Sequence, residues 1–203
     1  MIVVLVLVLV GGGLLLLYLR SVRRRTAFFT ARTAEAARLG LHPAVLDPWL
    51  AGVADRVFRT HGQAARMVAG PGVRVCDFTS QASATATAAK CHLLAYDLPV
   101  ALPSLVVEQH NPFVPGQEFE SAAFNSAFSV ECADPRYASA VLHPQLLEWL
   151  LAHPWLEWRI EGGALVAWGV GYWTVPRVQE LTSALGGIAE RIPPYVLEEY
   201  RLR

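Results

Sequence analysis

The first nineteen residues place the strongest constraint on this chain. Residues 2–19 (IVVLVLVLVGGGLLLLYL) carry no charge and are interrupted only by three glycines. At about 1.5 Å of rise per residue, a helix of this length spans about 27 Å, close to the roughly 30 Å hydrocarbon core of a bilayer. Because a backbone in lipid must satisfy its own hydrogen bonds, a helix is favoured despite the many valines. The sequence therefore predicts a transmembrane helix at residues 1–19.

Four arginines directly after the apolar run predict its direction. They are Arg20, Arg23, Arg24 and Arg25, and no basic residue precedes the run. A cleaved signal peptide would carry its charge before the run and small residues after it. By the positive-inside rule, residues 20–27 form a basic juxtamembrane linker in the cytoplasm, and the N-terminus faces outside. We expect the four arginines to contact anionic lipid headgroups at the membrane surface.

The rest of the chain has the size and charge of one globular domain. The 203 residues leave room for a single cytoplasmic domain at residues 28–203. Basic and acidic residues balance at 17 each, which gives no sign of nucleic-acid binding. The cysteines, Cys76, Cys91 and Cys132, are odd in number and widely spaced, so reduced thiols are expected rather than a disulfide framework.

Helix and strand signals occur in blocks rather than in alternation. Caps and apolar stripes predict helices at residues 30–39, after Asp47-Pro48, after Asp134-Pro135, after His143-Pro144 and at residues 175–191. Strands are expected at residues 73–79, 91–96, 105–108 and 124–132, with a loop at 80–88 and a hairpin of 155–160 and 164–170 turning at Glu161-Gly162-Gly163. This order favours an α+β domain: an antiparallel sheet with helices packed on one face.

No motif of known chemistry occurs in the sequence. It lacks a GxSxG elbow, a phosphate loop ending in GK[ST] and a GxGxxG fingerprint. Cys91 and His92 are adjacent on an expected strand, so their side chains point to opposite faces and do not form a metal-ligand pair. We therefore predict no catalytic residue, no cofactor and no metal.

Aromatic residues are concentrated between residues 149 and 173. Core packing is the simplest explanation for them. The alternative is an aromatic patch for a protein partner or for the membrane interface, where tryptophan is favoured. The candidates for such a contact are Trp155, Trp158, Trp168 and Trp173. In this interpretation, Trp158 and Trp168 lie on the two arms of the expected hairpin.

Three sequence runs resemble a family of uncharacterised actinobacterial membrane proteins. They are LDPWL at 46–50, FESAAFNSAFSVECADPRYASAVLHPQLLEWLL at 119–151 and ERIPPYV at 190–196. The resemblance covers about residues 28–196 and implies an N-terminal anchor with one soluble domain of unknown function. It implies no reaction or cofactor. Asn125 and Asp134 in the central run are interpreted as turn and cap residues.

Two functions are compatible with these features. The first is a non-catalytic, single-pass accessory or scaffold protein of the cell membrane, whose partners are membrane lipids and an integral membrane complex. An extra subunit of an actinobacterial respiratory supercomplex is one concrete form of it. The second is a membrane-tethered enzyme or binding domain for a lipid or envelope-precursor ligand at the inner leaflet. That function requires a pocket with convergent polar groups, which the sequence does not reveal.

Overall fold

The computed structural model describes residues 2–81, 88–113 and 116–202, with side chains in the first helix described from residue 15 on, except at residue 25. The helices are α1 (Ile2–Ala37), α2 (Pro48–Phe58), α3 (Ala122–Ala127), α4 (Pro135–Val141), α5 (Pro144–Leu151), α6 (Val175–Ala189) and α7 (Pro194–Glu199). The strands are β1 (His42–Pro43), β2 (Gly62–Gly70), β3 (Val73–Ser80), β4 (Lys90–Gln109), β5 (Phe128–Cys132) and β6 (Trp158–Val170).

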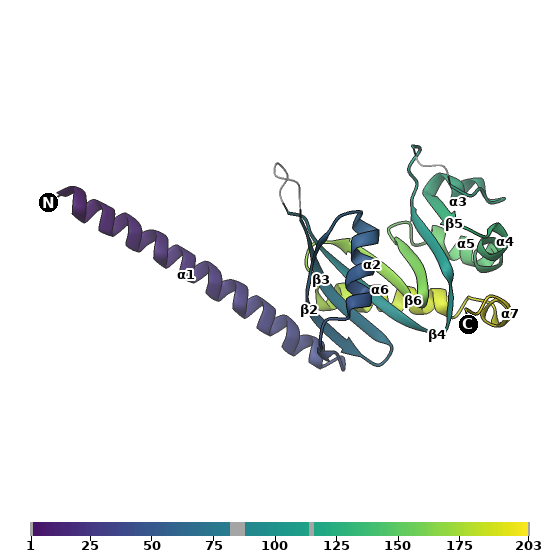
Figure 1. Ribbon diagram of the computed structural model, residues 1–203, viewed down its shortest axis with the longest axis horizontal. Coiled ribbons are helices and arrows are strands. Elements are labelled where there is room, and N and C mark those ends of the chain that lie inside the picture. The colour runs from purple at the N-terminus through teal and green to yellow at the C-terminus, as the bar shows by residue number, and fades with distance from the viewer. Residues whose placement is uncertain (1, 82–87, 114–115, 203) are drawn as a thin grey trace.

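The six strands form one antiparallel sheet built around β4. Strand β3 pairs with the first half of β4, β5 pairs with its last residues, and β6 runs beside β4 over most of its length. Strand β2 continues the sheet beyond β3 (Figure 1), and β1 pairs with the far edge of β2. The α+β class with an antiparallel sheet is therefore confirmed.

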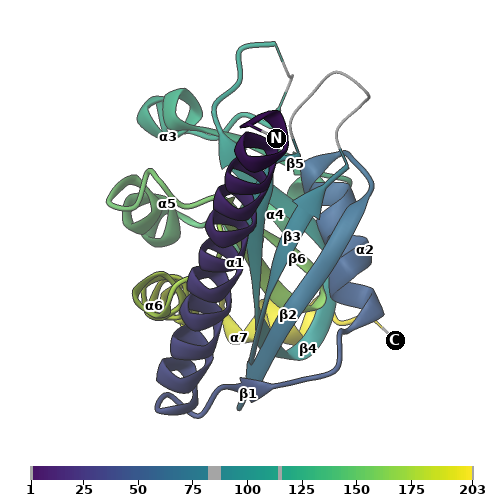
Figure 2. The same ribbon diagram turned by 90° about the vertical axis from the view of Figure 1, so that its left-hand side faces the viewer.

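The helices cover both faces of the sheet, where we expected them on one. Figure 2 shows α3, α5 and α6 on one side of the strands and α2 on the other. Buried Leu50 and Val53 of α2 belong to a core cluster that includes Phe78 and Leu93 of the strands. The cause is that both alternating sets of side chains in β3, β4 and β6 are apolar, so each face needs a cover.

Helix α1 is a single helix of 36 residues. It includes residues 20–27, expected as a linker, and most of residues 30–39, expected as a separate helix. Its N-terminal part extends away from the domain, and its last turns contact β1 and α6 (Figure 1). The side chains of residues 1–14, most of the expected membrane segment, are not among those described. Among the described residues, no helix is both long and apolar enough to cross a membrane.

Residues 155–170 do not form the expected hairpin. They include the continuous strand β6, which pairs with β4 on both sides of Gly162. The register shifts there, because Asp97 pairs with Ala164 whereas Leu102 pairs with Gly162, whose φ is +56°. Glycine at this position thus makes an irregularity within one strand, not a turn between two. Most of the loop predicted at 80–88 lies outside the described residues.

Local cap signals located three helix starts correctly. The carboxylate of Asp47 accepts the backbone N–H of Trp49 at the start of α2, and Asp134 caps α4 in the same way. Helix α5 begins after His143 without a side-chain cap. The strand expected at 124–132 begins only at Phe128, because the Ser121 hydroxyl caps α3 by accepting the N–H of Phe124 at 3.2 Å.

Candidate functional site

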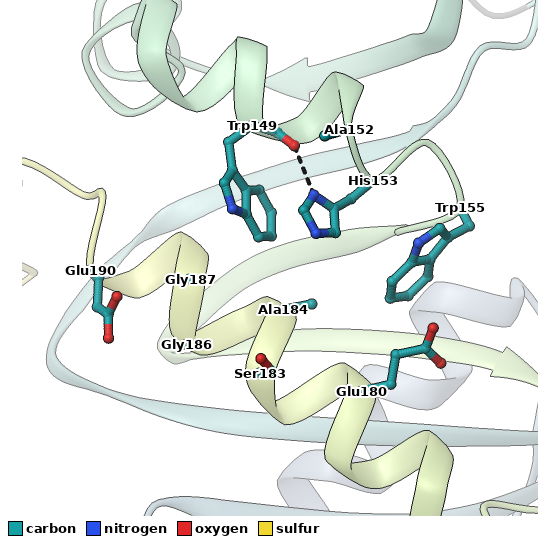
Figure 3. A pocket seen from close by; sticks show the side chains of 10 residues that line it. All are labelled: Trp149, Ala152, His153, Trp155, Glu180, Ser183, Ala184, Gly186, Gly187 and Glu190. Atoms are coloured by element: carbon teal, nitrogen blue, oxygen red, sulfur yellow. Dashed lines mark hydrogen bonds between the residues drawn. The ribbon is translucent and has the colours of Figure 1, made fainter.

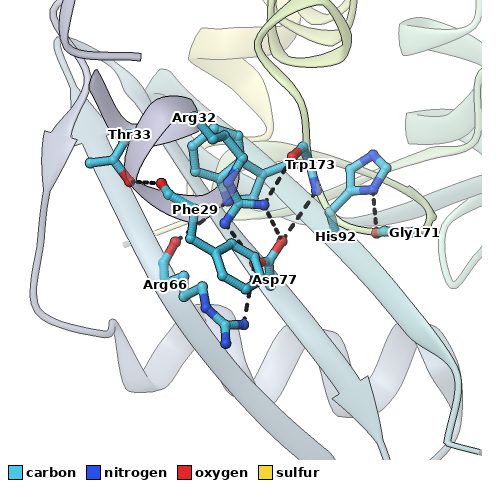
Figure 4. Close-up of polar contacts among 8 residues, drawn as sticks. All are labelled: Phe29, Arg32, Thr33, Arg66, Asp77, His92, Gly171 and Trp173. Atoms are coloured by element: carbon cyan, nitrogen blue, oxygen red, sulfur yellow. Dashed lines mark hydrogen bonds and ion pairs between the residues drawn. The ribbon is translucent and has the colours of Figure 1, made fainter. Parts of the chain in front are cut away.

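A buried ion pair fixes α1 to the sheet (Figure 4). The Arg32 guanidinium donates to both carboxylate oxygens of Asp77 on β3, at 3.1 and 2.7 Å, and to the carbonyl of Trp173 at 2.9 Å. The backbone N–H of Trp173 donates to the same carboxylate at 3.1 Å. Only 4% of the Arg32 side chain and 1% of the Asp77 side chain are exposed. Three segments distant in sequence therefore meet at one carboxylate.

Aromatic rings enclose this ion pair. The Arg32 guanidinium lies 3.7 Å from the ring centre of Trp173 and 4.9 Å from that of Phe29. On the other side of Phe29, the Arg66 guanidinium lies 3.8 Å from the ring centre. The Trp173 indole N–H donates to the Arg66 carbonyl at 3.4 Å. Such contacts partly replace the hydration that a buried guanidinium loses.

His92 is a second buried polar residue on the same face of the sheet. Its Nδ1 lies 3.0 Å from the carbonyl of Gly171, so Nδ1 carries the proton, and its buried Nε2 has no partner. Burial lowers the pKa of His92, and nearby Arg177 and Arg32 act in the same direction, against the opposing effects of the Gly171 bond and Asp77. The fold therefore favours the neutral imidazole.

We predict that His92 makes the domain less stable in mild acid. Because its folded pKa is lowered, its contribution is fully present above the unfolded pKa of about 6.5 and is lost as pH falls toward the folded value. His92→Asn keeps a donor for Gly171 but does not titrate. Urea unfolding at about pH 7.5 and about pH 5.5 should show a larger loss of stability in the wild type than in the variant. Equal losses would mean that His92 is charged in the folded protein.

The residues predicted to contact the membrane or a partner differ in their exposure. Arg20, Arg23 and Arg24 are exposed on α1, as membrane contact requires, and the side chain of Arg25 lies outside the described part. Three of the four tryptophans are core residues, which corrects their assignment as partner contacts: Trp158, Trp168 and Trp173. Trp158 and Trp168 lie on one strand but face opposite cores, because the irregularity at Gly162 reverses the alternation of side chains.

Trp155 is partly buried and lines a groove of about 750 Å³ along α6. We call this the α6 groove (Figure 3). One wall consists of Trp149, His153 and Trp155, from the end of α5 and the loop after it. The Trp149 and His153 rings stack with centres 3.9 Å apart, and His153 Nδ1 lies 2.8 Å from the Trp149 carbonyl. The aromatic wall is thus a fixed part of the fold.

Small residues of α6 form the floor of the α6 groove. Ser183, Ala184, Gly186 and Gly187 lie beneath the rings, with Glu180 and Glu190 toward the two ends. A Cβ atom at Gly187 would come within 2.9 Å of Trp149 Cζ2, whereas one at Gly186 would meet only ordinary contacts with Tyr96 at 3.8 Å or more. Gly187 therefore lets Trp149 lie against the helix.

The cysteines are poorly suited to nucleophilic chemistry. Burial, reinforced by the charges of Asp77 and Asp47, raises the pKa of the Cys76 thiol to about 12. Burial also raises the pKa of Cys91 and Cys132. Because the thiolate is the reactive form, each thiol carries less of it near neutral pH than an ordinary cysteine does. Among the described residues, no group of three or more His, Cys, Asp or Glu side chains is placed to hold a metal ion.

A further groove lies beside α2, on the same face of the sheet as that helix. It has a volume of about 600 Å³ and is lined by charged side chains of both signs, including Arg59, Glu108, Glu131 and Arg159. Burial raises the pKa of Glu108, with the neighbouring carboxylates of Glu157 and Glu131 adding to the effect against Arg59 and Arg159. The arrangement holds a carboxyl group with a raised pKa but no nucleophile beside it that is activated at neutral pH.

Comparison with known proteins assigns no family to the chain. No protein-family model matches it, and no curated protein matches its sequence. A crystal structure of the mycobacterial trehalose monomycolate transport factor A aligns with a TM-score of 0.49 and 11% sequence identity, covering 86% of this chain and 97% of that one. A likeness at this level assigns neither a family nor a function to this chain.

Proposed function

We propose that the chain is a non-catalytic accessory protein, anchored in the cell membrane by residues 2–19 and holding its domain in the cytoplasm. The observation that carries the proposal is the continuity of α1, which runs from the apolar segment into the domain and ends in the buried Arg32–Asp77 pair. A protein that only needed tethering would be served by a flexible linker. A continuous helix fixed to the sheet instead holds the domain at a set distance and orientation.

The exposed surface of α1 supports the same proposal. Leu15, Leu16, Leu17 and Tyr18 are each more than half exposed on α1, with no domain residues to cover them. Such side chains fit a lipid environment. Exposed Arg20, Arg23 and Arg24 follow within about two turns, at the height of the headgroups, and favour the cytoplasmic side for the domain.

The proposed partners are membrane lipids and an integral membrane complex. Confining the domain to a layer at the membrane raises its effective concentration for other proteins held there. Nothing in the described residues or in the comparisons favours a respiratory supercomplex over any other membrane assembly.

We predict that deletion of residues 1–25 releases a folded domain from the membrane. The residues that dock α1 on the sheet, Phe29, Arg32 and Ala36, remain in the shortened chain, so its thermal unfolding should stay cooperative. In cell fractionation it should move to the soluble fraction. In affinity purification with mass spectrometry, it should lose the integral membrane proteins that co-purify with the full-length chain.

The control is a fusion of residues 1–25 to an unrelated soluble domain. It shares the membrane location but not the domain, so partners specific to the full-length chain should be absent from it. The accessory role is contradicted if the full-length chain enriches no integral membrane protein over this fusion. Activity of a periplasmic phosphatase fused after Arg203 would contradict the orientation.

A further inference from the structure

The α6 groove has the dimensions of a small-molecule site. Its volume of about 750 Å³ lies within the range of roughly 300–1,000 Å³ typical of ligand pockets. A protein interface would instead present a broad aromatic patch, and three of the four tryptophans that could have formed one are buried in the cores. The partly buried indole of Trp155 thus stands in a concave site.

Each end of the groove carries both signs of charge. Arg177 donates to the Glu180 carboxylate at 2.6 Å and lies 4.6 Å from the ring centre of Trp155. At the other end, Glu190 is followed by Arg191, whose guanidinium lies 5.3 Å from the ring centre of Trp149 and donates to the Gly187 carbonyl at 2.8 Å. A carboxylate and a guanidinium group therefore occur together at each end of the aromatic wall.

This pairing of charges argues against a charged ligand. A guanidinium already lies 4.6 Å from the ring centre of Trp155 and 5.3 Å from that of Trp149, so an organic cation beside either ring would be repelled by it. An anion would meet the carboxylates of Glu180 and Glu190 in the lining. An acyl chain would bury these carboxylates without giving them hydrogen bonds, which is costly.

A neutral ring with hydroxyl groups satisfies all of these features. The Ser183 hydroxyl donates and accepts, and the carboxylates of Glu180 and Glu190 accept, so ligand hydroxyls can find partners of both kinds. The C–H face of a sugar ring is apolar and suits an indole wall. We propose that the α6 groove binds a neutral sugar unit, with Trp155 as its stacking residue.

The arrangement is suited to binding the sugar rather than cleaving it. Glycosidases place two carboxyl groups about 5–9.5 Å apart across the scissile bond. Glu180 and Glu190 are ten positions apart on or next to α6, a rise of about 15 Å along the helix axis. Binding is independent of the accessory role proposed above, and either conclusion can fail without the other.

The test uses full-length protein in nanodiscs of phosphatidylglycerol and phosphatidylcholine. Glycoside detergents are avoided because their sugar headgroups would compete for the groove. Glucose, mannose and maltose are titrated in the millimolar range, with tryptophan fluorescence and saturation-transfer NMR as readouts, and glycerol and choline serve as controls. We expect saturable binding of at least one sugar and none of the controls.

Two matched pairs of variants locate the binding. Trp155→Ala should raise Kd about tenfold or more. Trp49→Ala should leave it unchanged, because Trp49 is also half-buried, with Arg74 5.0 Å from its ring centre, but lies on α2 across the sheet. Gly187→Ala should weaken binding by displacing Trp149, whereas Gly52→Ala should not, because Gly52 lies on α2 and an added Cβ there would meet only an ordinary contact with Arg56 at 3.7 Å. The proposal is overturned if the wild type binds none of the sugars, binds choline instead, or keeps its Kd in Trp155→Ala.

Discussion

Replacing Asp77 with alanine is expected to lower the free energy of unfolding by about 3–5 kcal/mol, the usual cost of removing one partner of a buried ion pair. The carboxylate accepts two hydrogen bonds from Arg32 and one from the backbone of Trp173. Without it, the Arg32 guanidinium stays buried with its charge uncompensated.

The measurement is urea unfolding of the full-length protein in a neutral detergent, followed by tryptophan fluorescence. Arg56→Ala is the matched control, because it breaks a 2.9 Å ion pair with Glu161 in which the Arg56 side chain is half exposed. That change should cost at most about 1 kcal/mol. Replacing both members of the buried pair, Arg32→Met with Asp77→Leu, should recover much of the lost stability. Equal costs for Asp77→Ala and Arg56→Ala would contradict the burial of the pair.

The buried Arg32–Asp77 pair also bears on the proposed function, because it restricts how α1 can move relative to the sheet. Apolar contacts would tolerate small rotations of α1 about its axis, whereas a guanidinium held by both oxygens of one carboxylate fixes its rotation and height. We therefore expect the pair to set the register between α1 and the sheet. Its cost in desolvation is offset by the rings of Trp173 and Phe29 beside it.

Features set by neighbouring residues could be predicted from the sequence. Asp47-Pro48 and Asp134-Pro135 start helices because a side-chain oxygen and a restricted φ act within one turn. The apolar stripe of α6 was predicted from its helical spacing, which is also a local pattern, and its members Val178, Leu181 and Ile188 are all buried. Asn125 was interpreted as a turn residue but lies within α3, where its side-chain amide bonds both the N–H and the carbonyl of Phe119.

Features that depend on residues distant in sequence could not be predicted from the sequence. Gly162 and Gly163 carry the same turn chemistry whether they end a hairpin or interrupt a strand, and only the pairing of β6 with β4 decides between them. Strand β2 was missed because its residues are mostly glycine and alanine, and Arg66 in its middle has a φ of +53°. Helix α7, which begins at the second of two successive prolines, Pro193 and Pro194, was not predicted from the sequence.

The candidate sites depend even more on tertiary structure. Arg32 is surrounded in sequence by exposed arginines, and its burial follows from Asp77, 45 residues away. The α6 groove brings Trp149 over Gly187, a pairing that no local pattern indicates. The spacing of Phe29, Arg32 and Ala36 would have indicated the packed face of α1, because these residues recur at helical intervals on the side that contacts the sheet.

Replacing Leu181 with alanine is expected to lower the free energy of unfolding by about 2–5 kcal/mol, the range for deleting a buried leucine side chain. Leu181 is fully buried on the inner face of α6, in the core cluster that also contains Leu94 and Leu165 of the strands. The cost combines lost burial with the cavity left between helix and sheet. Strands β4 and β6, paired along their length, have little freedom to close that cavity.

The matched control lies on the same helix. Gly186→Ala adds a methyl group where the nearest atom of Tyr96 is 3.8 Å away, so no clash arises. Alanine in place of glycine inside a helix should raise stability by up to about 1 kcal/mol. The two substitutions should therefore move the urea midpoint in opposite directions if α6 buries Leu181 in the core and leaves room for a methyl group at Gly186. An unchanged midpoint in Leu181→Ala would mean that α6 packs through another face, and the groove above it would have to be assigned anew.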